Sequence, residues 1–194
     1  MNRTNLALVC LAILLLFLTA VVAACIDDDD DDADDNDDDN DDNDCTTWTD
    51  PSTGHMWENG KEYFGAWYDA IEYCLNLSCG DYDDWRLPTI DELRSLIRGC
   101  EGTELGGSCG VSDPGCTYYD CRNSDCGGCE EYEGPALDGY YLPDDLNGDY
   151  YVYWSATEII DEDEFAWIVN YKYAGVTSGY FTSEYSVRCV RGGD

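Results

Sequence analysis

The order of apolar and polar positions divides the chain into three parts. Residues 6–22 form an almost unbroken apolar run, and residues 27–44 contain only Asp, Asn and one Ala. Residues 45–194 alternate apolar and polar positions and hold all six Trp and all sixteen Tyr residues. This third part is long enough and apolar enough to bury one compact core.

Two segments of this domain have the periodicity of amphipathic helices. Apolar residues recur at helical spacing over residues 66–77 and place Cys74 on the buried face. Thr89 and Glu92 have the spacing of a capping box, so we expect a second helix to begin there and to end near Gly99.

Strands are predicted on both sides of the helices. Residues 46–49 and 55–57 flank a turn that contains Pro and Gly, which indicates a β-hairpin. Near the C-terminus, apolar and polar residues alternate over residues 151–154, 165–173 and 184–189. The order of a hairpin, two helices and then three strands predicts an α+β domain with an antiparallel sheet.

Residues 99–150 have no sustained period and are rich in Gly, Asp, Tyr and Cys, so we expect a long irregular loop insertion. Six cysteines lie in it: Cys100, Cys109, Cys116, Cys121, Cys126 and Cys129. A segment with few aliphatic residues needs cross-links to hold one shape, and disulfides supply them. Six cysteines allow fifteen pairings, among which the sequence does not choose.

Two other uses of these cysteines deserve comparison with disulfides. A four-cysteine zinc site needs four thiolates, which Cys116, Cys121, Cys126 and Cys129 could supply. However, only Cys126 and Cys129 have the close sequence spacing that is usual in such sites. Cys126 and Cys129 have the spacing of a redox pair, but no strand and helix flank them as in thioredoxin-like sites. Disulfides therefore remain the prediction.

The charge of the chain excludes some classes of function. The chain has 9 Lys and Arg against 43 Asp and Glu, which gives a net charge of −34. Fourteen of the acidic residues lie in 27–44 and one basic residue, Arg3, precedes them, so residues 45–194 carry −21. Such a domain repels nucleic acid. The single histidine, His55, excludes a multi-histidine metal site, and no motif indicates an enzyme.

The first 24 residues are predicted to be a lipoprotein signal peptide. Arg3 precedes the apolar run, and the ending Val22-Ala23-Ala24-Cys25 resembles a bacterial lipobox. Lipidation of Cys25 and loss of Cys10 leave ten cysteines, an even number, whereas cleavage after Ala24 without lipid leaves eleven. Residues 25–44 then form a lipidated, disordered, Asp-rich tether. We expect an exported protein anchored by lipid to the bacterial cell envelope, at the outer membrane or cell surface.

Two groups of residues in the insertion are candidate ligand contacts. Asp145, Asn147 and Asp149 place oxygen atoms at alternate positions around a Gly, a spacing that suits calcium, although an Asn-Gly turn with solvated acids is the favoured explanation. Four tyrosines are candidates for stacking on sugar rings, and the alternative is that they cover the disulfides of the loop. They are Tyr118, Tyr119, Tyr140 and Tyr141.

Several motifs closely resemble the family of the C-terminal domain of the Legionella collagen-like adhesin, over nearly all of residues 46–193. They include Trp48-Thr49-Asp50-Pro51, Trp85-Arg86-Leu87-Pro88-Thr89, Tyr153-Trp154-Ser155-Ala156-Thr157 and Arg188-Cys189-Val190-Arg191. The resemblance implies a bacterial, exported binding domain. The best-understood member binds sulfated polysaccharides, a ligand that a net charge of −21 should repel.

The order of elements also resembles C-type-lectin-like domains. That resemblance implies a disulfide between Cys74 on the first helix and Cys189 on the last strand. Cys45 and Cys79 are then the remaining cysteines outside the loop, and we expect them to pair. Short pieces also resemble formylglycine-generating enzymes, but their catalytic cysteine pair has no counterpart in this sequence.

The function expected from these features is that of a non-enzymatic binding or adhesion module in a cell-surface or envelope lipoprotein, with carbohydrate as its ligand. One alternative is a structural envelope protein that binds a protein partner. An enzyme that modifies glycans or proteins is a third class, for which no catalytic residue is singled out. The expected partners are the membrane, through the lipid, and a glycan or envelope protein.

Overall fold

The computed structural model describes residues 45–60, 63–146 and 152–192. The predicted signal peptide, Cys25 and the Asp-rich run lie outside the described residues, as do Asn147 and Asp149. Within these ranges, neither helix has the length and apolar character needed to cross a membrane.

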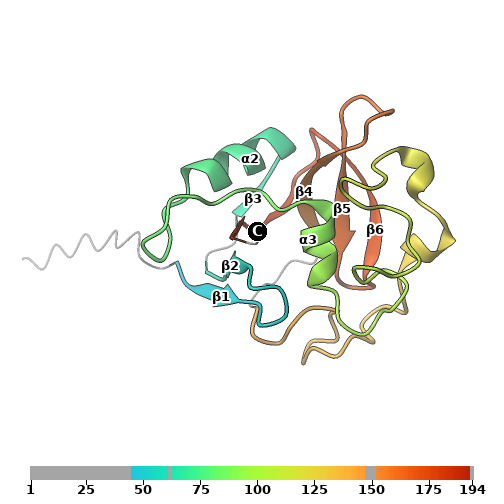
Figure 1. Ribbon diagram of the computed structural model, residues 1–194, viewed down its shortest axis with the longest axis horizontal. Helices are drawn as coiled ribbons and strands as arrows, with labels where there is room; N and C mark the ends of the chain where they lie inside the picture. Colours follow the sequence, from blue (N-terminus) through green and yellow to red (C-terminus); the bar gives the residue numbers. More distant parts are fainter. Residues whose placement is uncertain (1–44, 61–62, 147–151, 193–194) are drawn as a thin grey trace, which may run out of the picture. The chain divides into compact units, whose positions relative to one another are not determined.

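The strands form two sheets (Figure 1). The three-stranded sheet has the order β1 (Thr47–Thr49), β2 (Met56–Glu58), β8 (Val190–Arg191). The five-stranded sheet has the order β3 (Tyr63–Gly65), β7 (Tyr185–Val187), β4 (Val152–Glu158), β5 (Phe165–Asn170), β6 (Gly175–Tyr180). The predicted α+β class and the N-terminal hairpin are confirmed.

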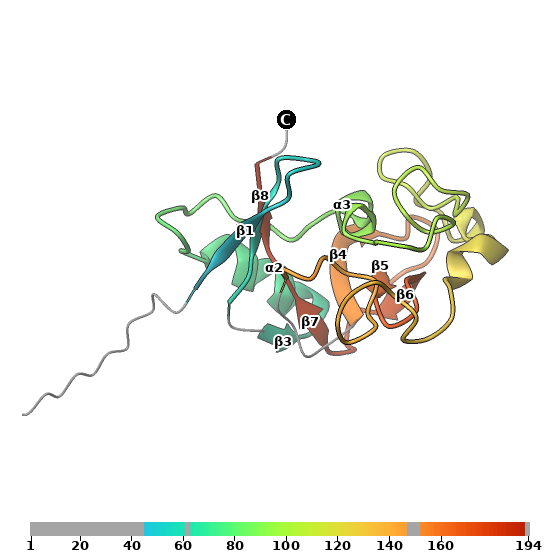
Figure 2. The same ribbon diagram turned by 90° about the horizontal axis from the view of Figure 1, so that it is seen from below.

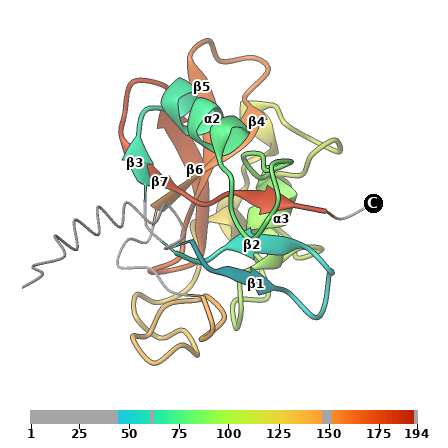
Figure 3. The same cartoon turned by 90° about the vertical axis from the view of Figure 1, so that its left-hand side faces the viewer.

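The prediction of one antiparallel sheet was wrong in two respects. The C-terminal strand is divided, because Arg188 and Cys189 leave the five-stranded sheet after β7 and the chain joins the other sheet as β8 (Figure 3). The five-stranded sheet is also mixed, since β4 and β7 run parallel and pair at Tyr153 and Ser186.

The hairpin of β5 and β6 shows why one strand was not predicted. Apolar alternation continues to residue 173, but β5 ends at Asn170, which pairs directly with Gly175. The intervening residues form a turn in which Ala174 has a φ of 56° and the Asn170 side chain accepts a hydrogen bond from the Lys172 N–H. β6 contains Gly, Thr and Ser at most positions, so it lacked the apolar pattern of a buried strand.

Both predicted helices are present. In α2 (Trp67–Asn76), Trp67, Ala70 and Cys74 are buried. α3 (Ile90–Ser95) begins with the predicted capping box, in which Thr89 Oγ1 accepts from the Glu92 N–H at 3.2 Å and the Glu92 carboxylate accepts from the Thr89 N–H at 2.8 Å. α3 ends before Gly99, because the next N–H groups bond to carbonyls three residues back in a tighter last turn.

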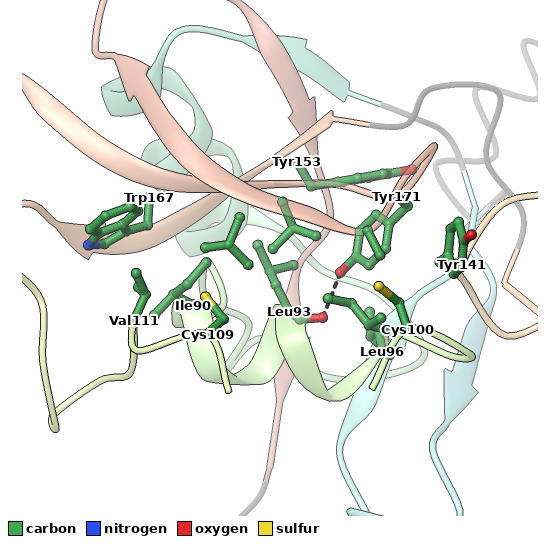
Figure 4. Packing of buried hydrophobic residues seen from close by; sticks show 14 of the residues in the cluster. Ile90, Leu93, Leu96, Cys100, Cys109, Val111, Tyr141, Tyr153, Trp167 and Tyr171 are labelled. Carbon is green, nitrogen blue, oxygen red and sulfur yellow. Dashed lines mark hydrogen bonds between the residues drawn. The ribbon is translucent and has the colours of Figure 1, made fainter. Parts of the chain in front are cut away.

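The main core lies between α3, the five-stranded sheet and the loop insertion (Figure 4). Tyr171 is buried there, and its hydroxyl donates to the Leu93 carbonyl at 2.8 Å. A second apolar cluster contains buried residues of α2 together with Trp85 and Trp154. In Figure 2 the three-stranded sheet and the loop of residues 100–130 lie on opposite sides of α3.

All ten cysteines of residues 45–189 form disulfides. Two are the expected pairs, Cys45–Cys79 and Cys74–Cys189. The three loop bridges are nested, one inside the next: Cys100–Cys129, Cys109–Cys126 and Cys116–Cys121. Because these thiols are all paired, the structure contradicts the four-cysteine zinc site and the Cys126–Cys129 redox pair.

Candidate recognition site

A hollow of about 180 Å³ lies on the surface of the insertion. One short segment lines it, and the lining residues are Ala136, Leu137, Asp138, Tyr140, Leu142, Pro143, Asp144 and Leu146. This segment belongs to the part coloured orange in Figure 3, which projects from the body of the domain next to β1. The sequence placed this segment in a loop but singled out only Tyr140 among the lining residues.

Backbone bonds of Tyr141 join the segment that lines the hollow to the core. The Tyr141 N–H donates to the Tyr171 carbonyl at 2.9 Å, and the Arg98 N–H donates to the Tyr141 carbonyl at 3.0 Å. Tyr141 itself is buried, and its hydroxyl donates to the Glu130 carbonyl at 2.8 Å. Burial and the nearby Glu133 and Glu130 carboxylates raise the pKa of this hydroxyl. The suggestion that Tyr141 stacks on a sugar is therefore wrong.

A tight turn forms one wall of the hollow. The Gly134 N–H donates to the Gly139 carbonyl, and the Gly139 N–H donates to the Ala136 carbonyl, both at 2.8 Å. Gly139 has a φ of 81°, and a Cβ at this position would lie 2.4 Å from the Tyr132 carbonyl oxygen. Only glycine satisfies both the conformation and the close approach, so this position depends on it.

Two carboxylates face this turn. Asp138 Oδ1 accepts from the Tyr140 N–H at 2.9 Å, and Asp144 Oδ1 accepts from the Leu137 N–H at 3.1 Å. A carboxylate has about four acceptor positions, so each keeps capacity for hydroxyl or ammonium groups. The Leu137 side chain, which also lines the hollow, is fully exposed. The hollow thus combines oriented acceptors with apolar surface.

An aromatic pair borders the hollow. The rings of Tyr132 and Tyr140 are stacked with centroids 5.8 Å apart. Lys172 Nζ lies 4.6 Å from the centre of the Tyr132 ring and 2.6 Å from a Glu131 carboxylate oxygen. The ammonium charge is therefore already neutralised by the protein.

Tyr118 and Tyr119 are exposed, as sequence reasoning proposed, but they belong to a different surface. They lie in the turn closed by Cys116–Cys121, and the Tyr119 N–H donates to the Asp161 carboxylate at 2.7 Å. The adjacent Ile160 is also exposed. The four candidate tyrosines therefore do not form one sugar-binding face.

The basic side chains that the structure describes already interact with other groups of the protein. Each of the seven that the structure describes contacts a carboxylate or a carbonyl of the chain itself. The pairs are Arg86 with Glu92, Arg94 with Thr103, Arg98 with Asp50, Arg122 with Val176, Lys172 with Glu131, Arg188 with Glu58, and Arg191 with Asp84. With most carboxylates left facing solvent, the surface favours neutral or cationic ligands over anionic ones.

Calcium binding at 145–149 stays a prediction. Asp145 is described, and its carbonyl accepts from the Asn59 side chain at 2.9 Å, but its two partners lie outside the described residues. Among residues 45–60, 63–146 and 152–192, His, Cys, Asp and Glu form no group of three placed to hold a metal ion.

His55 belongs to a charged cluster that joins the hairpin to α3. Its Nε2 lies 3.4 Å from Glu92 Oε1, and Arg86 makes two hydrogen bonds to the same carboxylate at 2.5 and 2.7 Å. Burial favours the neutral acid, but the bonds from Arg86 and the Thr89 N–H outweigh it and lower the pKa of Glu92. Because the Glu92 carboxylate is bonded to groups of the protein itself, we interpret the cluster as structural: it holds the hairpin against α3.

Two buried charges that sequence reasoning missed support the scaffold of the site. The Arg94 guanidinium donates to the carbonyls of Thr103, Val111 and Glu104, which fixes the start of the insertion on α3. Glu58 is buried beside the Cys74–Cys189 bridge and accepts from the Tyr73 hydroxyl at 2.5 Å. Burial raises the pKa of Glu58.

These features define the class of protein: an α+β domain linked by five disulfides, with a long bridged insertion that presents an acidic and aromatic hollow. The chain belongs to the Lcl C-terminal domain family, whose profile matches residues 46–191. The match confirms the family inferred from the sequence motifs. Among curated proteins, none matches this chain.

Proposed function

We propose that this protein is an exported, lipid-anchored module of the bacterial cell envelope that binds carbohydrate without modifying it. The observation that carries the proposal is the hollow, whose lining segment is hydrogen-bonded to the core through the Tyr141 backbone. A site that is formed before its ligand arrives loses less entropy on binding. Five disulfides support export, because such bridges persist in oxidising compartments.

The chemistry of the hollow favours sugars of a particular kind. The half-buried Tyr140 ring, which lines the hollow and is backed by Tyr132, suits the apolar face of a pyranose ring, and Asp138 and Asp144 suit its hydroxyl or amino groups. Because the seven basic side chains that the structure describes are occupied and residues 45–194 carry −21, sulfated glycans are disfavoured. We therefore assign the site to neutral or amine-bearing glycans.

The finer fold assignment, a C-type-lectin-like domain, belongs to the same proposal. It is supported by the Cys74–Cys189 bridge, which joins α2 to the C-terminal segment as in that class. It is also supported by a long insertion between the helices and the last strands, the region through which many lectins bind their ligands.

A glycan array probed with the full chain tests the binding function. We expect signals on neutral or glucosamine-containing oligosaccharides and none on heparin. Tyr140→Ala and Asp138→Asn should each reduce the signal at least tenfold, whereas Tyr119→Ala, an exposed tyrosine on another surface, should leave it unchanged. Silence across neutral and amine-bearing glycans, both with calcium and with a chelator, would refute the proposal. Loss only with the chelator would assign a calcium ion to binding.

A structural role with a protein partner has its own supporting observation. Tyr118, Tyr119 and Ile160 expose 51%, 42% and 65% of their surface, and the Ile160 N–H bonds to the neighbouring Thr117 carbonyl. If this surface binds an envelope protein, replacing both tyrosines by Ser should abolish a cross-link formed in intact cells while glycan binding persists.

The anchor has a separate test. Cys25→Ala should release the exported protein from the membrane fraction, and Cys10→Ala, in the predicted signal peptide, should not. Retention of the Cys25→Ala protein in membranes would contradict lipid anchoring at this position.

A further inference from the structure

Two disulfides meet within a short stretch of chain at the end of α2. Cys79 pairs with Cys45, the first residue that the structure describes, with 5.5 Å between their Cα atoms. Cys74 pairs with Cys189, near the other end of the domain, with 5.4 Å between their Cα atoms. Only the chain from Cys74 to Cys79 lies between the two bridges.

This connectivity creates a covalent shortcut through the domain. From Cys45 the path crosses one bridge, follows five residues back from Cys79 to Cys74, and crosses the second bridge to Cys189. Five extended residues span about 17 Å, so Cys45 and Cys189 cannot be separated by more than about 30 Å while both bridges are intact. Without bridges the same 144 residues would extend to about 500 Å.

We propose that these two bridges form a tension clamp, which carries force applied between the two ends of the domain. The load passes through the sulfur atoms, residues 74–79 and the two-residue strand β8 that follows Cys189. The hairpin β1–β2, the five-stranded sheet, α3 and the loop insertion therefore lie off the load path. At most the last turn of α2 is pulled, since α2 ends at Asn76. The physiological use of the clamp rests on the proposed function, because an N-terminal anchor would bring force in at Cys45.

Force applied between Cys45 and a ligand bound in the hollow would follow a related path. From Cys79 it runs along the chain to Cys100, crosses to Cys129 and reaches the segment that begins at Ala136. The hairpin β1–β2, strand β3 and all of α2 are bypassed through Cys45–Cys79. The two inner loop bridges lie inside Cys100–Cys129 and also carry no load.

Single-molecule stretching of the full chain tests the clamp. One handle is attached to a non-natural side chain at Asn43 and the other beyond Asp194, and the oxidised protein is pulled. We expect no unfolding step longer than about 30 Å in the oxidised wild type. After complete reduction, the stretched length between Cys45 and Cys189 should increase to about 500 Å.

Paired substitutions give distinct lengths. Removing Cys45–Cys79 with two serines makes residues 45–74 load-bearing and should give about 100 Å. Removing Cys74–Cys189 routes the load through residues 79–100, the Cys100–Cys129 bridge and residues 129–189, which gives about 280 Å. Removing Cys116–Cys121 is the matched control, since this bridge lies off the path, and should change nothing.

The stretched length counts residues between bridges, so it is informative even for a variant that does not fold, provided peptide mapping confirms the remaining bridges. An unfolding step above about 50 Å in the oxidised wild type, or equal lengths for the two outer-bridge variants, would overturn the clamp. The handle at Asn43 replaces the anchor, and no ligand takes part in the measurement. A failure of glycan binding or of lipidation therefore refutes the proposed function alone.

Discussion

Replacing Arg94 by Met removes a charge that connects α3 to the loop insertion while keeping most of the side-chain volume. The guanidinium is 2% exposed. Its Nε donates to the Thr103 carbonyl at 2.9 Å, and its two terminal nitrogens donate to the carbonyls of Val111 and Glu104. The variant therefore deprives three backbone carbonyls of a donor without opening a large cavity.

The expected cost follows from the burial of those carbonyls. Thr103 and Val111 are fully buried, and a buried acceptor without a partner costs about 1–3 kcal/mol. Glu104 adds little, because its carbonyl also accepts from the Gly107 N–H. Burial lowers the pKa of Arg94, which shows that the charged form is partly disfavoured, so removing it recovers some free energy. The net loss of stability should be about 2–4 kcal/mol.

Urea unfolding of the oxidised protein, followed by Trp fluorescence, measures this loss. Arg122→Met is the matched control, because Arg122 is exposed and, within the described part of the chain, its side chain donates only through Nε to the Val176 carbonyl, so its cost should stay below about 1 kcal/mol. Hydrogen exchange should accelerate over residues 100–111 in the Arg94 variant. Equal unfolding free energies for the two variants would refute the assigned role.

Three further predictions concern other parts of the domain. Burial raises the pKa of Glu58, so the folded state keeps the proton of this carboxyl group to higher pH than the unfolded chain does. The stability that this protonated group contributes should be lost as pH rises through the folded pKa. Glu58→Gln should flatten that part of the pH profile of the unfolding free energy. Gly139→Ala should destabilise the domain by more than Gly106→Ala, since both glycines have φ near 80° but only Gly139 faces a backbone oxygen, and thermal unfolding of the pair decides this. Non-reducing peptide mapping should recover Cys100–Cys129, Cys109–Cys126 and Cys116–Cys121, and any exchanged partner would contradict the nested arrangement.

Short sequence motifs were sufficient to predict the helix or hairpin in which they occur. The capping box at Thr89 and Glu92 located α3, and the turn between residues 49 and 55 located the first hairpin. Five of the six Trp residues are buried as the pattern suggested, and only Trp48 is partly exposed. The capping box and the turn depend on neighbouring residues alone, and the apolar pattern was enough to assign most of the Trp residues to the core.

Features set by distant contacts could not be read in the same way. β3 has three residues and exists through its pairing with β7, more than a hundred residues further along the chain. The nested bridges depend on how the insertion packs against β6 and α3. Asp138 and Asp144 were not singled out from the sequence, because their orientation follows from backbone bonds across a turn. The Gly and Pro residues of 134–143 were the signal available, and they indicated turns without indicating a hollow.

Nesting of the three loop bridges also affects what happens when the chain is cut. Any single peptide bond broken between Cys100 and Cys129 leaves at least one bridge across the break, and a cut between Cys116 and Cys121 leaves all three. A protease that nicks this exposed segment therefore cannot detach it. On an exported protein the insertion would survive digestion as a two-chain structure, and only reduction would reveal the damage.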